Sequence, residues 1–174
     1  MENKELSKVK LGKLSHIGIV VRDLDKAVDY YSSVFGLGPF RTDVYELKPF
    51  MYRGKPANAR VKAAIAYSGS VFIELVEVLE GETPHTEFLK EKGEGIQHVA
   101  FLVRDLDQKL EELGKSGIEP VMQYRLLTDN PARNDGAASG ASKTRLELKE
   151  VYLNSDKIGG AMIQLMEFKE VPED

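Results

Sequence analysis

Two of the three histidines in this 174-residue sequence occupy the same place in a repeated motif. His16 lies in segment 15–25 and His98 in segment 97–107, so the copies are 98 − 16 = 82 residues apart. Both copies share the histidine and the run Val-Arg-Asp-Leu-Asp. Five consecutive identities beside a shared histidine indicate an internal duplication. A duplicated pair of imidazoles is a candidate site for one divalent metal ion.

The last predicted strands of the two halves also match and add Glu74 and Gln164. Side chains alternate along a strand, so we expect these two residues to face the histidines and Glu77 and Glu167 to face solvent. Two imidazoles, a carboxylate and an amide oxygen suit a divalent cation that keeps positions open for water or substrate. The alternative is that each histidine is an ordinary hydrogen-bonded residue of the core.

Each half is predicted to be a βαβββ module that positions these side chains. Apolar alternation and helical spacing predict strands at 14–21, 37–47, 60–68 and 71–79 with a helix at 26–35, and strands at 96–103, 119–127, 146–154 and 161–168 with a helix at 108–116. Asp25 and Asp107 are predicted to cap the two helices. Gly18 and Ala100 lie two residues after the histidines and leave room beside the imidazoles.

The predicted fold class is α+β, with two tandem βαβββ modules forming a cupped mixed sheet around a metal-binding cleft. We expect a tail at 1–12, the first module at 13–82, a linking helix at 83–94, the second module at 95–169 and a tail at 170–174. His85 is predicted to lie on the surface of the linking helix. Segment 128–143 is rich in turn residues and is interpreted as a long loop, either a lid or an idle insertion.

The composition excludes several classes of function. There is no cysteine, which excludes disulfides, thiolate zinc sites and cysteine nucleophiles. The net charge of −4 argues against nucleic acid as the main partner. No apolar run is long enough to span a membrane, and the charged first 13 residues lack the apolar segment of a secretory signal. We therefore expect a cytoplasmic protein that acts on a small molecule.

The segments around both histidines resemble the vicinal oxygen chelate superfamily. The resemblance spans about 13–168 and is most specific at 93–98, which reads Gly-Glu-Gly-Ile-Gln-His. Within the superfamily the sequence is most similar to the methylmalonyl-CoA epimerases and next to glyoxalase I. The resemblance implies a metal-dependent isomerase or lyase that moves a proton next to a carbonyl through an enolate. It implies that a divalent ion such as Co, Mn, Ni, Zn or Mg is held by His16, Glu74, His98 and Gln164.

One position departs from the family pattern. The family's epimerases and glyoxalases usually carry glutamate at the last ligand position, where it also moves the substrate proton, and this chain has Gln164. An amide oxygen can bind a metal but cannot serve as a general base. Glu74 and Lys62 are the remaining candidates for the base, and Lys62 would need a pKa lowered by burial.

A coenzyme A thioester would need positive charge near the cleft for its phosphates. Arg53, Lys55 and Arg60 flank the predicted turn at 52–56 and could supply this charge, or could form an ordinary solvated basic loop. Tyr45 and Tyr67 could line the cleft.

Two other classes of function stay open. One is a ring-cleaving dioxygenase, and the other is a metal-free binding protein of the bleomycin-resistance type. Because repeat proteins of this shape commonly dimerise, we also expect a homodimer.

Overall fold

The computed structural model describes residues 9–129, 145–157 and 159–171. Most of the predicted loop at 128–143 lies outside the described residues, and residues 128 and 129 belong to a strand. None of the described helices is long and apolar enough to cross a membrane.

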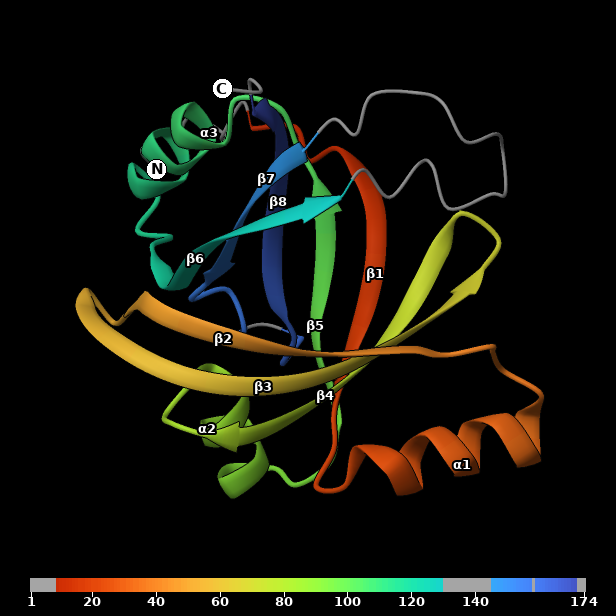
Figure 1. The fold of residues 1–174 in the computed structure, drawn as a ribbon. Helices are drawn as coiled ribbons and strands as arrows, with labels where there is room; N and C mark the ends of the chain where they lie inside the picture. Colours follow the sequence, from red (N-terminus) through yellow and green to blue (C-terminus); the bar gives the residue numbers. More distant parts are fainter. Residues whose placement is uncertain (1–8, 130–144, 158, 172–174) are drawn as a thin grey trace.

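The order of elements confirms the duplicated module (Figure 1). The first module consists of β1 (Lys13–Val20), α1 (Leu24–Phe35), β2 (Arg41–Tyr52), β3 (Lys55–Ser68) and β4 (Val71–Glu80). The second consists of β5 (Gly95–Leu102), α3 (Leu106–Gly114), β6 (Pro120–Asp129), β7 (Arg145–Leu153) and β8 (Met162–Val171). The linking helix is α2 (Pro84–Glu91), which begins after the capping residue Thr83.

The eight described strands form one closed barrel in the order β1-β4-β3-β2-β6-β7-β8-β5. Each module supplies four neighbouring strands, in which its first and last strands pair in parallel. The modules join through the antiparallel pair β1 and β5 and through a short pairing of β2 with β6. The expected cupped sheet is therefore confirmed, and the two cups close on each other. Helices α1, α2 and α3 lie outside the strands (Figure 1).

Alternation along β3 separates the barrel interior from the helical layer. Val61, Ala63 and Ile65 line an internal cavity, whereas Ala64 packs outward in a core cluster with Leu24 of α1. The short side chain of Ala63 on this inner face leaves space at the centre of the barrel. This space adjoins the predicted metal ligands.

The predicted helix caps, Asp25 and Asp107, are wrong by two residues. The residue at the start of α1 is Asp23, whose side chain accepts a hydrogen bond from the Lys26 backbone N–H. The equivalent residue of α3, Asp105, has a left-handed backbone (φ 55°) and makes no capping bond through its side chain. Asp25 and Asp107 lie inside the helices and are free to pair with the sheet.

Two carboxylates from the sheet support the helix starts instead. Glu77 accepts a hydrogen bond from the Leu24 N–H at 3.0 Å, and Glu167 accepts one from the Leu106 N–H at 3.2 Å. Both glutamates lie on the outer face of the sheet, as predicted, where the start of the helix covers Glu167 and partly covers Glu77. Glu167 is only 6% exposed. The expectation of a solvent-facing glutamate is therefore wrong for Glu167, and Glu77 is only partly exposed.

Candidate metal centre

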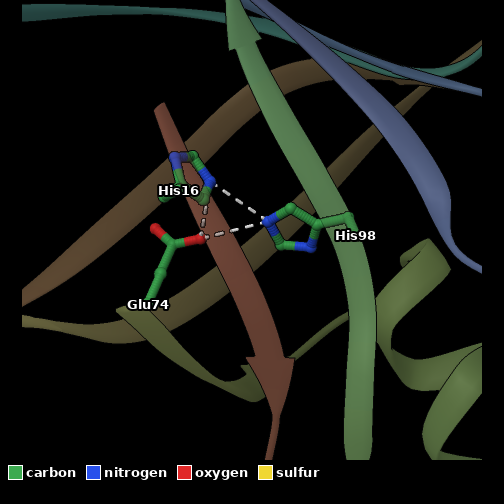
Figure 2. A group of neighbouring side chains, drawn as sticks. All are labelled: His16, Glu74 and His98. Atoms are coloured by element: carbon green, nitrogen blue, oxygen red, sulfur yellow. Dashed lines mark hydrogen bonds and ion pairs between the residues drawn. The ribbon is translucent and has the colours of Figure 1, made fainter. Parts of the chain in front are cut away.

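Three polar side chains converge inside the barrel from three different strands. His16 Nε2 lies 3.4 Å from Glu74 Oε2, His98 Nε2 lies 3.3 Å from the same oxygen, and the two Nε2 atoms are 3.2 Å apart. Figure 2 shows both rings and the carboxylate pointing toward one another. The two histidines are almost completely buried. Among the described residues, these three form the group of histidine and carboxylate side chains close enough to share a metal ion.

The strand register explains why the three side chains meet. Gly18 of β1 pairs with Glu74 of β4 on one side and with His98 of β5 on the other. A Cβ atom on Gly18 would lie 1.9 Å from Cε1 of the His98 ring. The His98 ring therefore occupies space that only a glycine at position 18 leaves free. The sequence predicted this space beside the imidazole.

The same arrangement repeats, with different chemistry, around Ala100. Ala100 of β5 pairs with His16 of β1 and with Gln164 of β8, as Gly18 pairs with His98 and Glu74. Gln164 is 1% exposed, and its Oε1 is buried without a hydrogen-bond partner. A buried acceptor without a partner is costly, and a cation held by this cluster would satisfy the Gln164 oxygen.

The His16 ring is held with one nitrogen toward the cluster. Its Nδ1 lies 3.3 Å from Ser15 Oγ, and the ring stacks on Phe72 with centroids 4.5 Å apart. These contacts leave Nε2 facing Glu74.

The charges of the cluster favour a cation. Burial raises the pKa of Glu74, but the two histidines outweigh burial and hold the pKa below its usual value. Burial lowers the pKa of His16, yet the Glu74 carboxylate outweighs it and the net pKa is raised. For His98, burial dominates and its pKa is lowered. Glu74 is therefore a carboxylate that stays ionised and is matched to positive charge between the imidazoles.

These observations fit a divalent metal ion. The donor set combines two imidazole nitrogens and a carboxylate oxygen with the unpaired amide oxygen of Gln164, a mixture that suits ions such as Zn, Co, Ni or Mn. Because Gly18 has no side chain, the His98 imidazole has the space it needs to reach the cluster.

A cavity of about 440 Å³ adjoins the cluster, a size that suits a small-molecule ligand. His16 and Glu74 form part of its wall, together with many apolar side chains. The aromatic side chains that line it are Tyr45, Tyr67, Phe72, Tyr124, Tyr152 and Phe168. Tyr45 and Tyr67 thus line the cavity as the sequence suggests.

The cavity also contains a carboxylate that the sequence analysis missed. Glu150 of β7 is 8% exposed and lines the same cavity as Glu74. Its Oε2 accepts hydrogen bonds from the Tyr124 hydroxyl and, at 3.0 Å, from Gln164 Nε2. Burial, reinforced by the charge of Glu74, raises the pKa of Glu150 to about 7.

One sequence signal could have found Glu150. On β7 the inward positions are Leu146, Leu148, Glu150 and Tyr152, all of which are buried. A single carboxylate on an otherwise apolar face of a strand needs a partner or a function.

Comparison with known proteins agrees with this fold. Residues 15–131 match the model of the Glyoxalase/Bleomycin resistance protein/Dioxygenase superfamily. The chain belongs to this superfamily. It is 30% identical over 114 residues to the uncharacterized protein YqjC of Bacillus subtilis, covering 66% of this chain and 74% of YqjC.

Two epimerases are also similar to the chain. It is 27% identical over 157 residues to the mitochondrial methylmalonyl-CoA epimerase of Mus musculus, covering 90% of this chain and 73% of that protein. The crystal structure of methylmalonyl-CoA epimerase from Mycobacterium tuberculosis superposes with a TM-score of 0.55 at 23% identity, covering 94% and 93% of the two chains. The structural likeness supports the superfamily fold.

Lys62, the second candidate base, does not lie near the cluster of His16, Glu74 and His98. Its Nζ lies 2.7 Å from both carboxylate oxygens of Asp25 on α1, outside the barrel. This ion pair raises the pKa of Lys62, the opposite of what a base requires. Lys149 pairs with Asp107 in the second module in the same way. The duplication therefore identifies Lys62 as a link between helix and sheet.

The three predicted phosphate-binding residues do not line the cavity. Arg53 pairs with Glu87 of α2 at 2.6 Å, and Arg60 pairs with Glu46 at 3.1 Å. Lys55 is exposed on the same hairpin. The cationic side chain that does line the cavity, among the described residues, is Arg41.

His85 is buried, and its prediction as a surface residue is wrong. It is 2% exposed, lines the cavity and lies with its ring centroid 5.7 Å from that of His98. The packing of α2 against the end of the barrel buries this histidine, and such a tertiary contact leaves no trace in an eight-residue helix.

Proposed function

We propose that this chain is a divalent-metal-dependent isomerase of the epimerase type. It would remove and return a proton on a carbon next to a carbonyl group, through an enolate. The observation that carries the proposal is that Glu150, a carboxylate outside the ligand set, faces the same cavity as His16 and Glu74, which cluster with His98. The site then has both a place for a cation and a group that can take a proton.

The residues that would bind the metal differ from the residue that would accept the proton. His16, Glu74, His98 and Gln164 would hold the metal, which polarises the carbonyl and stabilises the negative charge of the enolate. Glu74 is a poor base, because its pKa is held low by the two histidines.

Glu150 is the better proton acceptor. Tyr124 and Gln164 both donate to its Oε2, which fixes the carboxylate and leaves Oε1 to take the substrate proton. A base is most effective when its pKa is near the working pH, and the pKa of Glu150 is raised to about 7. Delivery of a proton to the opposite face of the same carbon completes the epimerisation without any other reagent, whereas return to the face that Glu150 deprotonated only exchanges the proton.

The substrate proposed for the first test is methylmalonyl-CoA, because the mouse relative is a methylmalonyl-CoA epimerase. The metal-loaded protein is incubated with methylmalonyl-CoA in deuterium oxide, and deuterium at C2 is followed by mass spectrometry. We expect exchange in the wild type and a loss of about 100-fold or more in Glu150→Gln, the usual range for a general base.

Glu147→Gln is the matched control. Glu147 lies on the same strand but pairs with Arg125 and does not line the cavity. Its exchange rate should equal that of the wild type. No exchange in the metal-loaded wild type would refute the epimerase-like activity, and full exchange in Glu150→Gln would refute the assigned base.

Metal content separates this proposal from a metal-free binding protein. Elemental analysis of the purified protein should give about one divalent ion per chain, which is lost in His16→Ala and in His98→Ala. A protein that binds no ion when zinc, cobalt or manganese is added would favour the bleomycin-resistance type of function.

A further inference from the structure

The residue before each histidine is displaced from the regular pairing of β1 with β5. On β1, Leu14 pairs with Phe101 and His16 with Ala100, so Ser15 is an extra residue. On β5, the pairing passes from His98 to Ile96, so Gln97 is an extra residue. Extra residues of this kind are β-bulges, which redirect side chains.

The bulges bring one polar side chain of each strand, Ser15 and Gln97, against the ring of the histidine that follows it. Ser15 and Gln97 are 6% and 1% exposed, and each contacts Nδ1 of the histidine that follows it. In a regular strand, neighbouring side chains would point to opposite faces of the sheet. In both modules, a β-bulge therefore places the preceding residue against Nδ1 of the histidine.

Gln97 makes the tighter of the two contacts. Its Oε1 lies 2.7 Å from Nδ1 of His98 and 3.1 Å from Nδ1 of His85, while its Nε2 donates to Met162 Sδ at 3.4 Å. A thioether sulfur can only accept, so the amide nitrogen faces Met162 and the amide oxygen faces the two imidazoles.

An amide oxygen cannot donate, so each imidazole must donate to it through an N–H at Nδ1. A neutral imidazole with hydrogen on Nδ1 has a free lone pair on Nε2. For His98, this lone pair is on the atom that faces His16 Nε2 and Glu74 Oε2. With hydrogen on Nε2 instead, His98 would donate to Glu74 and could not bind a metal through that nitrogen.

We propose that Gln97 is a positioning residue that fixes His98 in the tautomer whose Nε2 binds the metal. His85, which is buried in α2, shares the same acceptor and braces the amide from the other side. This inference rests on the proposed metal centre for its functional meaning, but the tautomer is a property of the metal-free protein.

The test compares two variants of one position. Gln97→Leu removes the acceptor, and Gln97→Glu keeps an oxygen that both imidazoles can donate to. The tautomer of His98 is determined from the ¹⁵N shifts of its ring in the metal-free protein. The dissociation constant for Zn²⁺ is measured by competition with a chromophoric chelator.

In the wild type and in Gln97→Glu we expect hydrogen on Nδ1 of His98. In Gln97→Leu we expect a shift of hydrogen toward Nε2 and Zn²⁺ binding weakened about 10- to 100-fold, the usual effect of losing the partner of a ligating histidine. Gln123→Leu on β6, which does not line the cavity, is the control and should leave both readouts unchanged.

Two results would overturn the inference. One is hydrogen on Nε2 of His98 in the metal-free wild type, which needs no variant to fold. The other is a Gln97→Leu protein with the wild-type tautomer and affinity. A wild type that binds no Zn²⁺ but has hydrogen on Nδ1 of His98 would refute the proposed function while leaving the role of Gln97 intact.

Discussion

Replacing Gly18 by alanine tests whether the cluster depends on the space beside His98. The added Cβ would lie 1.9 Å from Cε1 of the His98 ring, whereas ordinary contact begins at 3.4 Å. The ring would therefore have to retreat by roughly 1.5 Å (3.4 − 1.9). Distances from a metal to its ligands vary by only about 0.2 Å. A displacement of this size removes His98 from the set of ligands.

We expect the Gly18→Ala protein to bind Zn²⁺ at least about 100-fold more weakly, since losing only the partner of a ligand costs up to about 100-fold. This corresponds to about 2.7 kcal/mol of binding free energy. The metal-free variant should also be less stable in urea by about 1–3 kcal/mol, because the core is overpacked.

Gly114→Ala is the control for the Gly18 substitution. A Cβ at this position of α3 meets nothing within 4 Å, so binding and stability should stay close to the wild type. Competition with a chromophoric chelator measures the affinity for Zn²⁺. Wild-type affinity in Gly18→Ala would refute the view that the three side chains form the metal centre in this geometry.

Three further predictions concern stability and assembly. Glu167→Ala should lower the free energy of unfolding by about 1–2 kcal/mol, because the Leu106 N–H loses its acceptor. The control is Glu170→Ala, at an exposed position, which should change the free energy of unfolding little. Equal free energies of unfolding for the two variants in urea titrations would contradict this prediction. Burial lowers the pKa of His85 to about 4, so below pH 6.5 the unfolded chain takes up a proton that the folded protein does not. Stability of the metal-free protein should therefore fall between pH 6.5 and 4, by on the order of 3 kcal/mol from this group, and His85→Asn should flatten that fall; parallel pH profiles would refute it. The homodimer stays a prediction from the sequence, and sedimentation equilibrium should give twice the chain mass of 19.4 kDa.

The sequence predicted those features that the duplication repeats. The order of strands and helices follows from two matching segments, and His16, His98 and Glu74 stand out because each has a counterpart in the other half. Glu150 has no such counterpart. Since Lys149 corresponds to Lys62, Glu150 corresponds to Ala63, so a comparison of the halves passes over it.

The burial of His85 was missed for a different reason, namely tertiary packing. His85 is buried because α2 packs against the end of the barrel, and no periodicity in eight residues can reveal this. The predicted basic residues lie on a hairpin longer than expected, since β2 and β3 continue to a two-residue turn at Arg53 and Gly54. Both of these residues have positive φ angles, as the tightest hairpin turns require.

The amide at position 164 and the carboxylate at position 150 are best understood together. A glutamate on β8 could bind a metal and move a proton, but it would place a second negative charge against Glu150. Gln164 avoids this repulsion because its Nε2 donates to Glu150 at 3.0 Å while its Oε1 stays available as a ligand. The ligand and the base are thereby separated onto β8 and β7. Gln164→Glu should then raise the pKa of Glu150 further, since like charges disfavour ionisation, and should slow proton exchange even though it restores the family's residue.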